Sequence, residues 1–170
     1  MTRFSVLSLV IAMITGTGLS RAEPHTIRFD NQCDKGTPQL VIGGEVLSSG
    51  EDWTSNGPQA GIAYLQTGQC LLNGEHCTLL EFNLNNPACA GCGSSVDISL
   101  VDPHALNVPI TFSYFNGCDG QGATCTTPDC RTAFHRSDDN QVQVACQVDN
   151  VGPFRAHTLD LRSLIMFQRI

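Results

Sequence analysis

The chain has 170 residues, the length of a single domain with a short appendage. Nine Lys and Arg residues against sixteen Asp and Glu residues give a net charge of −7, which argues against nucleic acid as a partner because phosphate binding needs clustered positive charge. A hydrophobic fraction of 41% excludes a disordered chain, and nine Cys, sixteen Gly and eight Pro residues favour a loop-rich all-β protein held by disulfides.

Residues 1–22 have the pattern of a secretory signal peptide. A positively charged start is followed by a nearly unbroken apolar run over Phe4–Ile14, and Ala22 is the small residue before a cleavage site at Glu23. The alternative, a transmembrane anchor, needs roughly 20 apolar residues, and this run is too short. We therefore expect a secreted protein, extracellular or in the cell wall, that does not contact a membrane and whose cysteines form disulfides.

Residues 23–150 have the pattern of one domain built from short β-strands. Apolar and polar residues alternate over 80–84 and over 96–100, with Glu81 and Asp97 on the polar sides. Further strand candidates lie at residues 27–29, 40–42, 62–65, 110–115 and 141–146. Many short strands separated by turn residues predict a β-sandwich or a β-barrel.

The nine cysteines leave one thiol over when the others pair. Local spacing favours three disulfides that each close a short loop, Cys70–Cys77, Cys89–Cys92 and Cys125–Cys130, although sequence alone does not fix the connectivity. Cys118–Cys146 would then close a longer loop. Cys33 remains without a disulfide partner, so we expect a monomer, with a dimer bridged through Cys33 as the alternative.

The Cys89-Ala-Gly-Cys92 segment also has the spacing of a zinc half-site or of a thioredoxin-like motif. A zinc site would need a second such pair or two suitably spaced histidines, and an oxidising compartment opposes free thiolates. A redox motif of the thioredoxin kind would need a βαβ setting and a helix N-terminus, neither of which the sequence indicates. We therefore expect a disulfide here, with no metal and no cofactor.

Three acidic residues are candidates for a binding or catalytic site. Glu81 and Asp97 lie on the polar sides of their strands, whereas Asp102 would point to the opposite face unless the chain bends near Pro103. Three carboxylates in one groove would suit hydrogen bonding to sugar hydroxyls, or acid/base hydrolysis. The alternative is three solvated acids on an acidic surface. Tyr64 is one of the few aromatic residues available for stacking on a sugar.

The composition changes at residue 151. Residues 151–170 contain three Arg and one Asp, and have no Cys and no alternating pattern. This atypical C-terminal tail is either a flexible or loosely docked end, or a segment foreign to the domain.

Several segments, taken in order, resemble the thaumatin-like proteins. The matching segments are the Asn-x-Cys ending of 25–33, Leu-x-x-Gly-x-x-Trp at 47–53, Glu-Phe-x-Leu at 81–84, and Val-Asp-Ile-Ser-Leu-Val-Asp at 96–102 followed by Asn-Val-Pro-Ile at 107–110. The resemblance spans roughly residues 26–146, with a large deletion between Cys118 and Cys146, as in small fungal-type members of the family. It implies a thaumatin-like β-sandwich with disulfide-clipped loops.

The resemblance also implies an acidic cleft that binds β-1,3-glucans, which some members of the family hydrolyse weakly. The family's cleft contains one Arg, one Glu and three Asp. Glu81, Asp97, Asp102 and Asp139 match the acids, with Asp138 as an alternative to the last. The Arg position falls near Gly61, and loss of that cation should raise the pKa of at least one of these acids.

A second departure from the family lies at the C-terminal end. In the family the first Cys pairs with a Cys on a final strand, and here the tail replaces that strand, which leaves Cys33 over. We therefore expect the sandwich to lose a strand and to expose a sheet edge.

Together these observations predict a secreted thaumatin-like protein that binds cell-wall β-1,3-glucan without a cofactor. The predicted binding residues are Glu81, Asp97, Asp102, Asp139 and Tyr64. One alternative is a weak endo-β-1,3-glucanase that uses Glu81 and Asp97 as its catalytic pair. The other is a secreted defence or interaction protein without carbohydrate activity.

Overall fold

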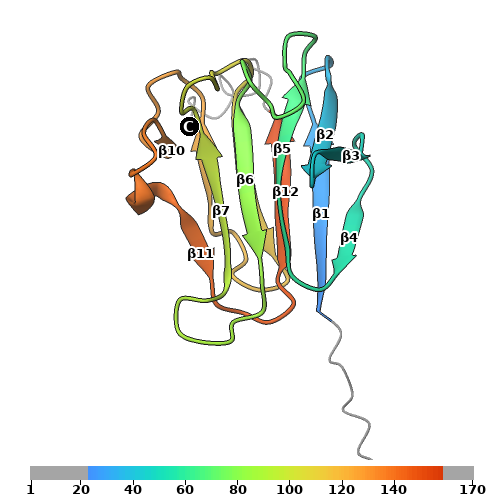
Figure 1. The fold of residues 1–170 in the computed structure, drawn as a ribbon, viewed down its shortest axis with the longest axis vertical. Helices are drawn as coiled ribbons and strands as arrows, with labels where there is room; N and C mark the ends of the chain where they lie inside the picture. The colour runs from blue at the N-terminus through green and yellow to red at the C-terminus, as the bar shows by residue number, and fades with distance from the viewer. Residues whose placement is uncertain (1–22, 159–170) are drawn as a thin grey trace, which may run out of the picture.

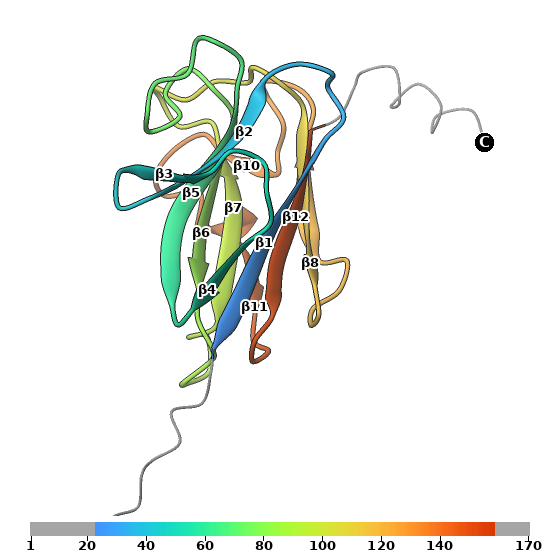
Figure 2. The same ribbon diagram turned by 90° about the vertical axis from the view of Figure 1, so that its right-hand side faces the viewer.

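Twelve short strands and the loops between them make up the described chain, which covers residues 23–158 of this computed structural model. They form two sheets that face each other across a hydrophobic core, as the side view in Figure 2 shows. The predicted all-β class with disulfide-clipped loops is confirmed. The expected signal peptide, residues 1–22, and the end of the tail, residues 159–170, lie outside the described residues. Between residues 23 and 158 no helix is long and apolar enough to cross a membrane.

The first sheet faces the viewer in Figure 1 and has seven strands. Its order is β10-β7-β6-β5-β2-β3, and β11 pairs with the same edge of β7 as β10. All its pairings are antiparallel except that of β10 with β7. The strands are β2 (Thr37–Ile42), β3 (Glu45–Ser48), β5 (Gln59–Gln66), β6 (Leu79–Leu84), β7 (Ser94–Ser99), β10 (Ala133–Phe134) and β11 (Val144–Cys146). A short 3-10 helix, η1 (Asn140–Val142), precedes β11.

The second sheet has five strands in the order β4-β1-β12-β8-β9 and lies behind the first. Its strands are β1 (Pro24–Asn31), β4 (Trp53–Asn56), β8 (Ile110–Phe115), β9 (Gly122–Cys125) and β12 (Gly152–Thr158). β12 lies between β1, to which it is parallel, and β8, to which it is antiparallel.

The position of β12 corrects two expectations about the C-terminal tail. The sheet does not lose a strand after residue 150, because Gly152–Thr158 forms its central strand. Val151, at the entry to this strand, is fully buried, and its carbonyl oxygen lies 3.0 Å from Nδ1 of the buried His25 on β1. The domain therefore extends to at least Thr158 rather than ending at residue 150.

Alternating burial along the strands explains how the core forms. In β6 the side chains of Leu80, Phe82 and Leu84 are buried while those of Glu81 and Asn83 are exposed, because successive residues of a strand point to opposite faces. The second sheet also turns one buried face toward the core; its core residues include Ile27, Ile110, Phe112, Tyr114, Cys125 and Ala156. Each large apolar side chain removed from water contributes about 1.5–3 kcal/mol, so the interface between the sheets stabilises the fold.

The four predicted disulfides are all present, and Cys33 takes part in none of them. Three are local: Cys70–Cys77 lies in the β5–β6 connection, Cys89–Cys92 lies in the β6–β7 loop, and Cys125–Cys130 joins the last residue of β9 to the loop that follows it. Cys118–Cys146 spans 28 residues and joins the segment after β8 to β11. This bridge therefore links the two sheets covalently.

Candidate functional site

The outer face of the seven-stranded sheet forms the floor of an open cleft of about 780 Å³. In the antiparallel register Glu81 on β6 lies directly opposite Asp97 on β7, so both carboxyl groups are on this face. The same alternation places Asn83, Ser95 and Ser99 beside them, and all three line the cleft. The floor is therefore a polar surface with two adjacent acids.

One wall of the cleft comes from the segment that follows β7. The backbone N–H of His104 donates to the carbonyl oxygen of Val101 at 2.9 Å, which closes a turn over Asp102 and Pro103. This is the bend near Pro103 that Asp102 needs in order to reach the face of Glu81 and Asp97. Val101, Asp102 and His104 line the cleft. Asp102 is thus brought to the same cleft as Glu81 and Asp97.

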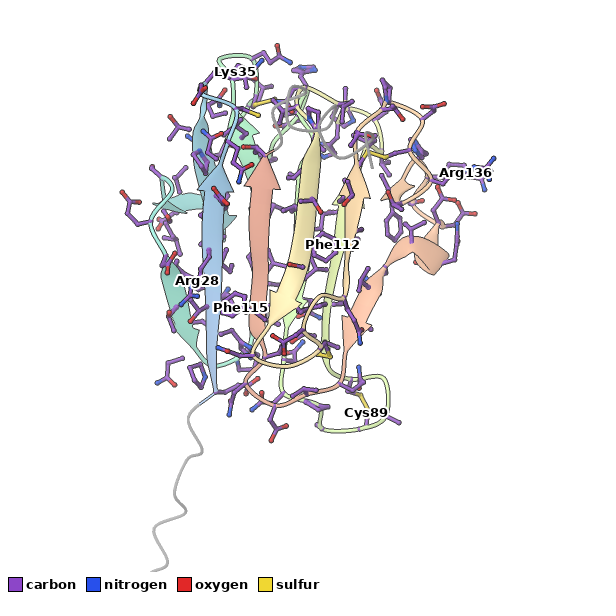
Figure 3. All side chains as sticks on the ribbon, turned by 180° about the vertical axis from the view of Figure 1, so that it is seen from behind. Arg28, Lys35, Cys89, Phe112, Phe115 and Arg136 are labelled. Atoms are coloured by element: carbon purple, nitrogen blue, oxygen red, sulfur yellow. A yellow bond between two sulfur atoms is a disulfide. The ribbon has the colours of Figure 1, made fainter. Side chains whose placement is uncertain are left out.

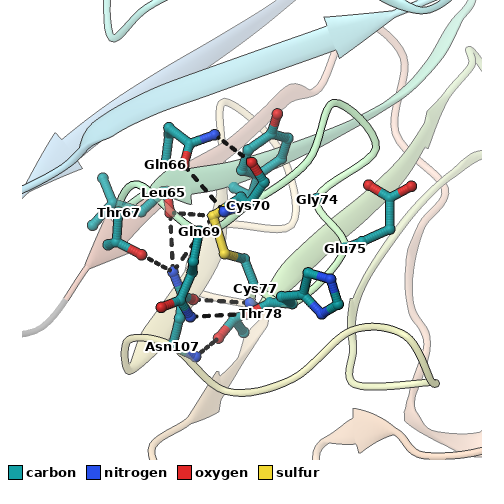
Figure 4. The surroundings of a disulfide bond; sticks show 12 residues. Leu65, Gln66, Thr67, Gln69, Cys70, Gly74, Glu75, Cys77, Thr78 and Asn107 are labelled. Carbon is teal, nitrogen blue, oxygen red and sulfur yellow. Dashed lines mark hydrogen bonds between the residues drawn. A yellow bond between two sulfur atoms is a disulfide. The ribbon is translucent and has the colours of Figure 1, made fainter.

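Asn107 ties this wall to the loop that carries the Cys70–Cys77 disulfide (Figure 4). Its Oδ1 accepts a hydrogen bond from the backbone N–H of Thr78 at 2.9 Å, and its Nδ2 donates to Leu65 O and to Thr67 Oγ1, each at 3.0 Å. One side chain therefore connects the β5–β6 loop with the residues after the turn. These contacts hold the wall in a defined position against the floor.

A second wall comes from β10 and the residues that lead to β11. Its lining residues are Phe134, Ser137, Asn140 and Gln143. Nε2 of Gln143 donates to Oδ1 of Asp97 at 3.4 Å, so this wall contacts the acid on the floor.

Asp97 is the most perturbed acid of the cleft. Only 6% of the residue is exposed, and burial raises its pKa to about 6, with the negative charge of Glu81 as the second cause. The hydrogen bond from Gln143 acts in the opposite direction. A raised pKa was expected from the missing Arg, but the largest cause here is removal of the carboxyl group from water.

A side chain at Gly61, where the resemblance places an Arg, would point to the core side of the sheet and not into the cleft, because Gly61 lies opposite the buried Phe82. A Cβ atom on Gly61 would lie 2.7 Å from the Phe82 ring and 2.7 Å from the carbonyl oxygen of Val41. Both distances are shorter than a Cβ atom allows, so a larger residue would force Val41 and the Phe82 ring to shift. The position that faces the cleft opposite Glu81 is taken by the uncharged Ile62. Among residues 23–158 no Lys or Arg lines the cleft, and His104 is its one basic side chain.

Asp139 lies outside the cleft lining, contrary to its predicted place in the groove. Its Oδ2 accepts hydrogen bonds from the backbone N–H groups of His135 and Arg136, at 3.0 and 2.9 Å, and these bonds hold the pKa of Asp139 below its usual range. Asp138, the alternative match, is exposed and forms an ion pair with Arg136. The structure therefore gives Asp139 a role in shaping the loop beside Ser137 and Asn140.

Tyr64 does not reach the cleft and offers no surface for stacking. It is 3% exposed and packs with Val41, Cys70, Cys77 and Leu79 beneath the β5–β6 loop. Its hydroxyl group lies 2.7 Å from Gln39 Oε1. The predicted platform for a sugar ring is therefore a core residue.

Several lining residues were not singled out from the sequence. Strand alternation could have found Asn83, Ser95 and Ser99, since they share a face with Glu81 and Asp97. No local signal points to His104 or Gln143, because their positions depend on how two loops fold over the sheet.

The cleft supplies hydrogen-bond acceptors and one buried acid. Within the described range no group of three or more His, Cys, Asp or Glu residues is arranged to hold a metal ion. No family model matches the chain, and no curated protein matches it significantly.

Proposed function

We propose that this protein is secreted and binds cell-wall polysaccharide of the β-1,3-glucan type through the cleft. The observation that carries this proposal is the convergence of Glu81, Asp97 and Asp102 in one open groove. The thaumatin-like motifs in the sequence support the choice of ligand, and the four disulfides are compatible with secretion.

The chemistry of the lining suits a neutral sugar chain. Ionised carboxylates accept two or more hydrogen bonds each, and sugar hydroxyl groups donate them. Asn83 and Gln143 add amide groups that both donate and accept, and Ser95 and Ser99 add hydroxyl groups. The cleft is open to solvent, so part of a long polymer can enter it without being enclosed.

A sedimentation assay with insoluble β-1,3-glucan tests this proposal. Hydrogen bonds to charged groups contribute about 1.5–3 kcal/mol, so Glu81→Gln should weaken retention at neutral pH by about ten-fold or more. Asp97→Ala should weaken it similarly. The matched control is Asp138→Asn, which changes an exposed acid outside the cleft. If both cleft variants are retained as well as the unaltered protein, the ligand does not bind in this cleft.

Weak glucan hydrolysis is the second candidate, and the state of Asp97 favours it. Asp97, with a pKa of about 6, can act as a proton donor at mildly acidic pH. Its hydrogen bond with Glu81 holds these two carboxyl groups closer than the roughly 5 Å that separates the catalytic pair of retaining glycosidases, so the second carboxylate of a hydrolytic site would have to come from elsewhere in the cleft. Release of reducing ends from soluble glucan should then fall as the pH rises above about 6, because Asp97 loses its proton. No release at acidic pH would leave binding alone as the proposed activity.

A further inference from the structure

The Cys89–Cys92 disulfide differs from the other three in its exposure. Residues 88–92 are all exposed, and both cysteines of this bridge are among them. Each of the other bridges contains at least one buried cysteine: Cys77 and Cys125 are 0% exposed, and Cys146 is 1% exposed. An attacking thiolate needs access to a sulfur atom, so this bridge is the one most open to thiols.

The loop that carries this bridge is also held by contacts that do not depend on it. Oε1 of Gln147 accepts hydrogen bonds from the backbone N–H groups of Gly91 and Gly93, at 3.0 and 3.2 Å. At the base of the loop, Ser94 Oγ donates to the carbonyl oxygen of Asn85 at 3.2 Å. Opening a bridge between residues three positions apart therefore releases only a short, anchored segment.

The position of the loop separates it from the cleft walls. Figure 3 shows Cys89 at the end of the molecule opposite to Lys35, and none of residues 85–93 lines the cleft. A reaction at this bridge would leave Glu81, Asp97 and Asp102 in place.

We propose that Cys89–Cys92 is a thiol–disulfide exchange site that reacts reversibly with low-molecular-weight thiols while the fold stays intact. The partner is a thiol of the glutathione class, recognised by its thiolate rather than by a pocket. No helix N-terminus is required, because the attacking group belongs to the external thiol and not to the protein. The proposal is independent of any activity of the cleft.

The exchange proceeds in two balanced steps. An external thiolate attacks the sulfur of one cysteine, a new S–S bond forms to that sulfur, and the other cysteine leaves with the electron pair as a thiolate and takes a proton from water. A second external thiolate then attacks the external sulfur of the mixed disulfide. The protein is left as a dithiol and the two external thiols as one disulfide, so two electrons have moved from the thiols to the protein.

Graded reduction followed by alkylation and peptide mass spectrometry tests the proposal on the unaltered protein. Thiols present at the start are first blocked with one alkylating agent, and those exposed by glutathione are labelled with a second. Cys89 and Cys92 should be labelled on the order of ten-fold faster than any cysteine of the other three bridges, with no loss of near-ultraviolet circular dichroism. Earlier opening of another bridge, or opening of all four together with unfolding, would overturn the proposal.

A trapping experiment gives a second measure. In Cys92→Ser the resolving cysteine is absent, so incubation with oxidised glutathione should leave a stable glutathione adduct on Cys89 of the folded protein; Cys89→Ser should do the same on Cys92. The matched control is Cys130→Ser, in which the remaining Cys125 is buried and should form the adduct on the order of ten-fold more slowly. Equal adduct formation in the three variants would contradict selective access at the loop.

Discussion

Asp97 is the residue of the cleft whose ionisation the fold makes unfavourable. Its carboxyl group is nearly buried and faces Glu81 across the strand pair, so ionisation is unfavourable for two reasons that add. An ordinary strand would have an uncharged residue at this position. The sequence keeps an acid where the fold penalises its charge, as binding and catalytic sites often do.

Replacing Asp97 by Asn should stabilise the protein at neutral pH. The pKa is about 6 in the folded state against 3.8 for the free group, so the unfolded chain loses the proton first and stability falls as the pH rises between these values. Asp97→Asn removes this loss and should raise the free energy of unfolding at pH 7 by on the order of 2 kcal/mol, with little gain at about pH 3.5. Urea denaturation at the two pH values measures the difference. A gain of the same size at both would contradict this account.

The sequence predicted part of the candidate site because part of it is local. Glu81 and Asp97 lie on strands whose alternation is plain, and Pro103 indicated the bend that brings Asp102 to them. Tyr64 and Asp139 were placed in the groove, but the fold puts neither there. Tyr64 is covered by a loop that only the three-dimensional fold lays over β5, and Asp139 is turned toward the backbone of its own loop.

At the scale of elements, β12 is the main feature that sequence patterns did not predict. Where burial along β12 is described, the buried residues are small, Gly152, Ala156 and Thr158, so these positions give little hydrophobic signal. Pro153 argues against a central strand, yet it falls where the register of β12 shifts against β8. β12 pairs in parallel with β1, which lies at the other end of the domain sequence, and no local sequence pattern can predict such a pairing. The strands that were predicted, such as β6 and β7, have large alternating apolar residues instead.

A charge at Ala156 tests the central position of β12. Ala156 is 5% exposed within the core, so Ala156→Asp would bury a carboxyl group without a partner and should lower the free energy of unfolding by about 3 kcal/mol or more. The control is Ala145→Asp on the exposed side of β11, which should change stability by less than about 0.5 kcal/mol. Thermal unfolding followed by circular dichroism compares the two. If they unfold alike, β12 is not a core strand.

At the scale of the whole molecule, Cys118–Cys146 joins the two sheets, and its loss should matter more than loss of a local clip. On the loop-entropy model, replacing both cysteines by Ala should cost roughly 3–4 kcal/mol, against about 2 kcal/mol for the same change at Cys89 and Cys92. Denaturant titrations of the two double variants give the comparison. An equal or reversed order would show that the long bridge does not constrain the unfolded chain in this way.

The parallel pairing of β1 with β12 has a consequence for how the protein is made. Asn31 and Thr158, whose side chains are 2.7 Å apart, are separated by 127 positions in the chain. Until residues 152–158 have been synthesised, the position of β12 between β1 and β8 is empty, and the part of the core that β12 covers stays open to water. The sandwich therefore closes only after residues 152–158 have emerged, and until then the nascent chain exposes unpaired strand edges that are prone to aggregation.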